Sequence, residues 1–166
     1  MKKLLLSLLL TIASISSVSA QLLVEGSLTP LRKADRVNIK IDFSEAMIHG
    51  MSESAFAKYE TDWEVDKPVI IGYFLSEARQ KCGDLINLGS YENADCEIRV
   101  SVISINEKGN YVCEANVYDS EGTVIAKIKD ISAKGGHFGT KLNLIKDGAR
   151  HTGAAFGKFL KNRAKR

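Results

Sequence analysis

The chain has 166 residues, with 23 Lys and Arg against 20 Asp and Glu, and hydrophobic residues make up 45% of it. The formal net charge of +3 is small, and part of it lies in the first 20 residues. These values favour one globular domain with a single core, and they give no support to a nucleic-acid partner.

The first 20 residues have the features of a signal peptide. Two lysines precede an apolar run from Leu4 to Ile12, and Val18 and Ala20 occupy the positions that a signal peptidase reads. The run is shorter than the roughly 20 residues that span a bilayer. We therefore expect cleavage after Ala20, a periplasmic or secreted protein, and no transmembrane segment in the mature chain.

Cleavage removes 20 of the 166 residues and leaves 146. The leader carries two lysines and no acidic residue, so 21 basic residues face 20 acidic ones in the mature chain, a net charge of +1. We divide the chain into the signal peptide (1–20), an amino-terminal extension (21–35) and a single α+β domain (36–163).

The first half of the domain predicts one strand and two helices. Residues 36–43 alternate apolar and polar side chains, which indicates a half-buried strand. Ser52 is a suitable N-cap for a helix through Tyr59. After a loop or short edge strand in "DWEVDKP", a second helix is expected to start at Asp66 and to end at Gly83.

The second half predicts three strands and a long helix. "CEIRVSVISI", "YVCEANVY" and "VIAKIKDI" each repeat with a period of two and are separated by turn residues. A turn centred on Lys108 and Gly109 pairs Val102 with Ala115. From about Thr140 the apolar spacing is helical, with a line of small residues expected to face the sheet: Ala149, Gly153 and Gly157. The order β-α-α-β-β-β-α predicts an α+β fold with a mixed four-stranded sheet and helices on one face.

The glycine-rich stretch "AKGGHFGTK" lies between the last strand and the last helix. Its G-G-x-x-G spacing matches neither type of phosphate-binding loop, so it indicates a corner in the chain. The histidines His49, His137 and His151 show no spacing diagnostic of a metal site. We predict no cofactor and no metal.

No motif of a hydrolase is present in the sequence. Asp42 and Glu45 follow the first strand and, with a histidine, leave open the alternative of a small envelope enzyme. A binder of small ligands or metal near His137 is a further alternative.

Three cysteines in an exported chain suggest one disulfide and one free thiol. In the predicted hairpin Cys96 and Cys113 lie too far apart along the strands to be bonded. Cys82 ends a helix and Cys96 opens a strand at the same end of the domain. We expect a Cys82–Cys96 disulfide, with three reduced thiols as the alternative.

The sheet face turned away from the helices is the candidate binding surface. It is expected to carry a mixture of charged, polar and apolar side chains that suits docking. The residues that we assign to binding are Arg99, Ile103, Glu114, Asn116, Tyr118 and Lys127. Ile105 and Val112 are expected beside them, and the basic carboxyl-terminal tail is expected to be solvated.

The segments "ADCEIRVSVISI" and "ANVYDSEGTVIAKI", with the D-x-x-G turn at 119–122, resemble a recurring envelope-domain pattern. The pattern is that of the TolB amino-terminal domain and of LpoB-type activators of cell-wall synthases, and the resemblance covers 36–160. It implies a small mixed sheet flanked by helices and a non-catalytic, partner-binding role. The chain lacks the lipoprotein cysteine and the propeller found in those families. We therefore expect an exported, non-catalytic domain that binds an envelope protein or glycan.

Overall fold

The computed structural model describes residues 22–165, so the predicted signal peptide and its cleavage site lie outside the described residues. The strands are β1 (Leu22–Gly26), β2 (Val37–Asp42), β3 (Met47–Ile48), β4 (Met51–Ser52), β5 (Leu88–Gly89), β6 (Cys96–Ile105), β7 (Tyr111–Asp119) and β8 (Val124–Ala133). The helices are α1 (Thr29–Lys33), α2 (Glu53–Tyr59), α3 (Trp63–Cys82) and α4 (Lys141–Ala164), and one 3-10 turn, η1 (Gly83–Leu85), follows α3.

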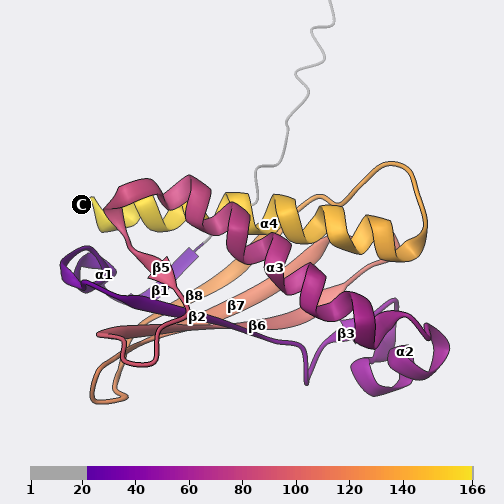
Figure 1. The fold of residues 1–166 in the computed structure, drawn as a ribbon, viewed down its shortest axis with the longest axis horizontal. Helices are drawn as coiled ribbons and strands as arrows, with labels where there is room; N and C mark the ends of the chain where they lie inside the picture. The colour runs from indigo at the N-terminus through magenta and orange to yellow at the C-terminus, as the bar shows by residue number, and fades with distance from the viewer. Residues whose placement is uncertain (1–21, 166) are drawn as a thin grey trace, which may run out of the picture.

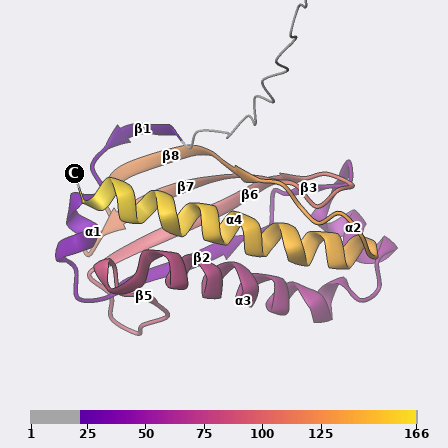
Figure 2. The same ribbon diagram turned by 90° about the horizontal axis from the view of Figure 1, so that it is seen from above.

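All eight strands form one sheet, whose main order is β1-β8-β7-β6-β2-β5 (Figure 2). β2 and β3 run parallel to β6, whereas β7, β8 and β1 are antiparallel to their neighbours. The α+β class is confirmed, but the prediction of a four-stranded sheet is wrong. The additional strands β1, β3, β4 and β5 have two to five residues each, which is too short to produce a clear alternating pattern.

β1 and α1 come from the segment that we treated as an amino-terminal extension. β1 pairs with β8 at one edge of the sheet. Leu31 in α1 and Leu28 just before it are both buried, because a spacing of three residues puts both side chains on the same side of a helical turn. This segment therefore contributes an edge strand and part of the core.

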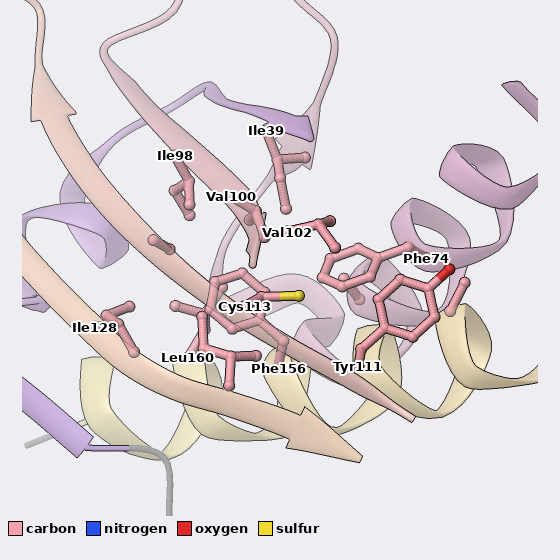
Figure 3. Packing of buried hydrophobic residues seen from close by; sticks show 14 of the residues in the cluster. Ile39, Phe74, Ile98, Val100, Val102, Tyr111, Cys113, Ile128, Phe156 and Leu160 are labelled. Carbon is pink, nitrogen blue, oxygen red and sulfur yellow. The ribbon is translucent and has the colours of Figure 1, made fainter. Parts of the chain in front are cut away.

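The two long helices lie side by side across one face of the sheet (Figures 1 and 2). The predicted apolar face of α4 is buried throughout, at Leu142, Ile145, Ala149, Gly153, Phe156 and Leu160. Figure 3 shows Phe74 of α3 and Phe156 of α4 packed toward strand residues such as Val100 and Cys113. The core therefore fills the space between the helices and the sheet.

Gly153 and Gly157 of α4 face α3 rather than the sheet. A Cβ atom on Gly153 would lie 2.3 Å from the Phe74 carbonyl oxygen, and one on Gly157 would lie 2.3 Å from the Ala78 carbonyl oxygen. Hydrogen at these positions lets the two helix backbones approach each other closely. The predicted role of this line in approaching the sheet is therefore corrected to helix–helix packing.

α3 begins earlier than predicted, at Trp63. We interpreted this segment as a loop or short edge strand. Instead, the Trp63 ring is completely buried and makes edge contacts with Phe43 and Phe56 at centroid distances of 5.6 and 5.2 Å. Its indole nitrogen donates to Glu53 Oε1 at 3.2 Å. Burial of this large side chain offsets the presence of Pro68 inside the helix.

The β6–β7 hairpin has a different register from the predicted one. Val102 is opposite Cys113 instead of Ala115, because the turn spans 106–110, where Asn106 Oδ1 accepts from the backbone nitrogens of Lys108 and Asn110. The shift is two residues. Since side chains alternate with a period of two, the predicted inward residues still face the core.

A bulge in β6 adds a further correction. The register shifts between Val102 and Ser104, and this leaves Ile103 as the extra residue. Ile105, which we expected on the open face, is therefore only 1% exposed. No helix within residues 22–165 is both long and apolar enough to cross a membrane.

Candidate functional site

The open face is the side of the sheet opposite α3 and α4, and Figure 1 shows it below the helices. The observed strand registers arrange its side chains in rows that cross the strands. Neighbouring rows are two residues, or about 6.6 Å, apart along each strand. Each row has its own chemical character.

The first of these, the cationic row, crosses five strands. Lys40 of β2 is opposite Arg99 of β6, Arg99 is opposite Asn116 of β7, and Asn116 is opposite Lys127 of β8. Glu25 of β1 follows Lys127 and forms an ion pair with it at 2.6 Å. The row thus contains three basic side chains and one acidic one.

The next row along the strands is acidic. Asp42 of β2 is opposite Ser101 of β6, which is opposite Glu114 of β7. Hydrogen bonds from the Ser44 backbone and side chain, both 2.9 Å long, lower the pKa of Asp42. No ion pair in the described part of the chain involves Glu114, which is exposed. We call Asp42, Ser101 and Glu114 the anionic row. On β8 the two exposed residues beside it, Lys129 and Asp130, have opposite charges.

An apolar patch follows the anionic row at the α2 end of the sheet. Met47 of β3 and Val112 of β7 lie on either side of Ser104, and Ile103 precedes that serine. The exposed fractions are 46% for Met47, 42% for Ile103 and 38% for Val112. We call Met47, Ile103 and Val112 the apolar patch; exposed apolar side chains that cluster in this way are typical of protein contacts.

Beyond the cationic row, at the other end of the face, Glu97 of β6 is opposite Tyr118 of β7. Glu97 pairs with Lys40 at 2.7 Å and also with Arg99. Burial raises the pKa of Glu97, but the hydrogen bonds and charges of these two cations outweigh that effect and lower it. The guanidinium of Arg99 lies 4.4 Å from the centre of the Tyr118 ring, so the basic and aromatic groups hold one another in place.

The structure brings the six predicted binding residues together on the open face. Arg99, Ile103 and Glu114 are exposed, and Asn116, Tyr118 and Lys127 are half-buried. Their role in binding stays a prediction. Sequence reasoning missed Lys40 and Glu97 because nothing in the sequence indicates that β2 lies beside β6, and it missed Met47 because β3 has only two residues.

The residues of the enzyme alternative do not form a site within residues 22–165. Asp42 is engaged with Ser44, and no hydrogen bond in this range joins Asp42 or Glu45 to a histidine. His151 Nδ1 is 2.8 Å from the Lys134 carbonyl oxygen, and His137 is exposed. No group of three potential metal ligands occurs in this part of the chain.

His49 lies in the turn between β3 and β4. Its ring contacts that of Phe56 at a centroid distance of 5.4 Å. Burial, followed by the charge of Lys141, lowers the pKa of His49. Its Nε2 atom is buried without a hydrogen-bond partner in the described residues, so this histidine is packed as a neutral side chain.

The glycine-rich corner packs against the hairpin turn. Gly135 donates its backbone N–H to Asn110 Oδ1 at 2.6 Å, and a Cβ atom at this position would lie 2.0 Å from the Lys108 carbonyl oxygen. Thr140 caps α4 by accepting from the Asn143 nitrogen at 3.3 Å. The glycine is therefore required by a close backbone contact.

All three cysteines are buried free thiols in the structure, so the predicted Cys82–Cys96 disulfide is not formed there. Cys82 Sγ donates instead to the Gly157 carbonyl oxygen of α4 at 3.4 Å. Burial raises the pKa of Cys82 and of Cys113 to about 12. Thiols with such values are not activated as nucleophiles.

A hollow of about 220 Å³ lies at the Tyr118 end of the open face, lined in part by Arg99, Tyr118 and Asp119. Sites for small molecules usually have about 300–1,000 Å³. This hollow is smaller than that range and can take one side chain from a partner.

No family model matches the chain, and no curated protein is significantly similar to it in sequence. Among solved structures, the PelC dodecamer from Paraburkholderia phytofirmans is similar with a TM-score of 0.46 and 11% identity, over 82% of this chain and 97% of that one. A variant of that dodecamer gives a TM-score of 0.42 and 10% identity, over 83% and 98%. Similarity at this level does not establish a shared function, and the resemblance to TolB-like and LpoB-like domains stays a prediction.

Proposed function

We propose that the protein is an exported, non-catalytic domain that binds a protein partner through the open face of its sheet. One observation carries this proposal. The face combines an exposed apolar patch with ordered charged rows, and the two long helices, α3 and α4, lie on the other side of the sheet. Apolar area next to complementary charge is the composition of a protein-binding surface.

The details of the face favour a protein over a glycan. Sugar rings stack on free aromatic faces, whereas Arg99 already covers the ring of Tyr118 at 4.4 Å. The exposed apolar residues of the patch, Met47, Ile103 and Val112, are aliphatic or thioether side chains. Such side chains insert into the hydrophobic centre of a protein interface.

Two features support a non-catalytic role. The lowered pKa of Asp42 opposes its use as a general acid. The two most deeply buried thiols have pKa values of about 12, which opposes nucleophilic use. The features of a signal peptide in the first 20 residues support export. Signal-peptidase cleavage after Ala20 would leave Gln21 as the one residue before β1.

The test uses the chain from Gln21 to Arg166 as bait in an envelope extract of its source cell. The bait is compared with Met47→Asp/Ile103→Asp, which places two charges in the apolar patch. The matched control is Val65→Asp, since Val65 is 74% exposed on α3. We expect one protein to be retained by the native bait and the control and to be lost with the patch variant.

The retained protein is then purified and its affinity for the three baits is measured. Two buried charges that meet no partner weaken an interface by roughly tenfold or more. Equal affinity for the native and patch-variant baits, or no retained protein, would remove the open face from consideration as a binding surface.

A further inference from the structure

The rows on the open face follow the same order along neighbouring strands. Along β6 the outward residues are Glu97, Arg99, Ser101 and Ile103, and β7 repeats the same order with Tyr118, Asn116, Glu114 and Val112. The first row therefore contains an acidic and an aromatic side chain. The cationic row comes next, then the anionic row, and the apolar patch is last.

The line between the cationic row and the anionic row divides the face into two complementary halves. A two-fold axis along this line turns a second copy over, so that its anionic row lies on the cationic row of the first. The same rotation places the apolar patch of one copy on the Tyr118 end of the other. A surface that matches itself in this way is what an isologous dimer requires.

We propose that the open face binds a second copy of this chain, face to face, about a two-fold axis that runs across the strands between the cationic and anionic rows. This inference rests on the proposed function, because it names the partner of the same face. It predicts that the contacts are reciprocal, so that each ionic contact occurs twice.

Three contacts at the level of residues follow from this axis. Lys40 lies opposite Asp42 of the second copy, since both belong to β2. Asn116 lies opposite Glu114 of the second copy on β7, and Arg99 on the adjacent strand is about 4.8 Å to the side, within reach of the same carboxylate. Glu114, which is exposed and has no ion pair in the described residues, gains a cation.

The apolar contacts follow the same rotation. Tyr118 lies opposite Val112 of the second copy, because both belong to β7. The aromatic edge of Tyr118 therefore covers part of the patch that is 38% to 46% exposed in the single chain. Removal of this apolar surface from water supplies the favourable term that the charges alone do not.

The ion pairs that exist within one copy affect how strong the dimer is. Glu97 is shared by Lys40 and Arg99, and Glu25 pairs with Lys127. These pairs hold the cations in position before association, which lowers the entropy lost on binding. They also neutralise part of the cationic row, so the association is moderate in strength and decreases with added salt.

The size of the face leads to the same conclusion. Five strands about 4.8 Å apart and six residues of about 3.3 Å each define a projected area of roughly 480 Å². Stable complexes bury roughly 800 Å² per partner. Twisted sheets that pack face to face also cross at about 30°, which limits the contact to the centre of the face. We therefore expect dissociation constants in the micromolar range, about 1 to 100 μM.

The decisive experiment uses two charge-reversed variants of the mature chain. Lys40→Glu/Arg99→Glu makes the cationic row acidic, and Asp42→Lys/Glu114→Lys makes the anionic row basic. Each variant then presents like charges to itself across the axis, so each is expected to dissociate at least tenfold more readily than the native chain. Sedimentation velocity over a concentration series measures this.

An equimolar mixture of the two variants is expected to form a heterodimer. On one side of the axis the acidified row of the first variant faces the basic row of the second, and on the other side the two unchanged rows face each other, so the complementarity returns. The control is Lys58→Glu/Lys158→Glu, which changes two exposed lysines on α2 and α4 by the same charge and is expected to dimerise like the native chain.

Circular dichroism confirms that each variant is folded. If Asp42→Lys disturbs the loop held by Ser44, the pair Arg99→Glu and Glu114→Lys repeats the mixing test without it. A native chain that stays monomeric to millimolar concentration, or a mixture that stays monomeric, would overturn the proposed dimer.

The outcome is distinguishable from a failure of the proposed function. If the inference is right, the protein retained from the extract by the native bait is the endogenous copy of this chain. A different retained protein that is lost with the patch variant leaves the binding function intact and overturns the dimer. Absence of both dimer and retained protein overturns both.

Discussion

Cys82 and Cys113 show at the scale of single residues how burial controls chemistry. Both side chains have no exposed surface, and burial raises their pKa to about 12 from an ordinary value of 9.0. The folded state therefore excludes the thiolate, whereas the unfolded state admits it. This difference links the stability of the fold to pH.

We expect the free energy of unfolding to decrease as the pH rises above about 9. The folded-state pKa is raised, so the contribution of each thiol is complete below the unfolded value and is lost between about pH 9 and about pH 12. Each thiol contributes a slope of up to about 1.4 kcal/mol per pH unit. Urea unfolding at a series of pH values measures it. The variant Cys82→Ala/Cys113→Ala should show a shallower slope than the native chain, and an equal slope would contradict the linkage.

Residue-scale reasoning on the candidate site succeeded where side chains alternate strictly. The period of two placed Arg99, Glu114 and Tyr118 on the outward face without any knowledge of the register, because a shift of two residues leaves the face unchanged. It did not show which residues lie opposite one another. The rows depend on the neighbours of each strand, and a single sequence does not encode them in any local pattern.

At the scale of elements, the backbones of α3 and α4 lie close together where glycines of α4 face α3. Gly153 lies where a Cβ atom would be 2.3 Å from the Phe74 carbonyl oxygen, whereas Gly72 on α3 has open space at the same position. Both glycines are inside helices. They form a matched pair. A change from glycine to alanine has the same effect on helix propensity at both positions, but it disturbs the packing of the two helices only at Gly153.

Gly153→Ala is expected to lower the free energy of unfolding by about 2 kcal/mol, because overpacking costs about 1 to 3 kcal/mol and outweighs the better helix propensity of alanine. Gly72→Ala is expected to raise it by up to about 1 kcal/mol. Chemical denaturation of both variants gives the two values. Stabilisation by Gly153→Ala would mean that the helices have room to separate.

Several elements were predictable from local chemistry. Ser52 caps α2 as expected, accepting from the Ala55 nitrogen at 3.3 Å, and the buried face of α4 has the predicted spacing. The start of α3 was not predictable, because Trp63 belongs to the helix through burial against Phe43 and Phe56 rather than through a capping signal. Elements fixed by local hydrogen bonds could be inferred, and those fixed by distant packing could not.

At the scale of the whole molecule, the segment that follows the predicted leader is part of the sheet. β1 covers one edge of β8, and the Ser27 nitrogen continues this pairing with the Ile125 carbonyl oxygen at 3.1 Å. An uncovered strand edge exposes unpaired backbone groups and promotes association with other chains. The sequence "LLVEG" is too short and irregular to predict such a role.

We expect a chain that starts at Ser27 to be less stable than one that starts at Gln21. It loses the β1–β8 hydrogen bonds and the Glu25–Lys127 ion pair, and at roughly 1 kcal/mol per backbone hydrogen bond, less the entropy regained by the strand, the cost is about 2 to 3 kcal/mol. Denaturant unfolding measures the difference, and light scattering detects the aggregation that an open β8 edge promotes. Glu25→Gln is the control, because it removes only an exposed ion pair and should cost less than about 1 kcal/mol. If the two chains were equally stable, β1 would contribute nothing to the stability of the sheet, and β8 would be its last stabilising strand.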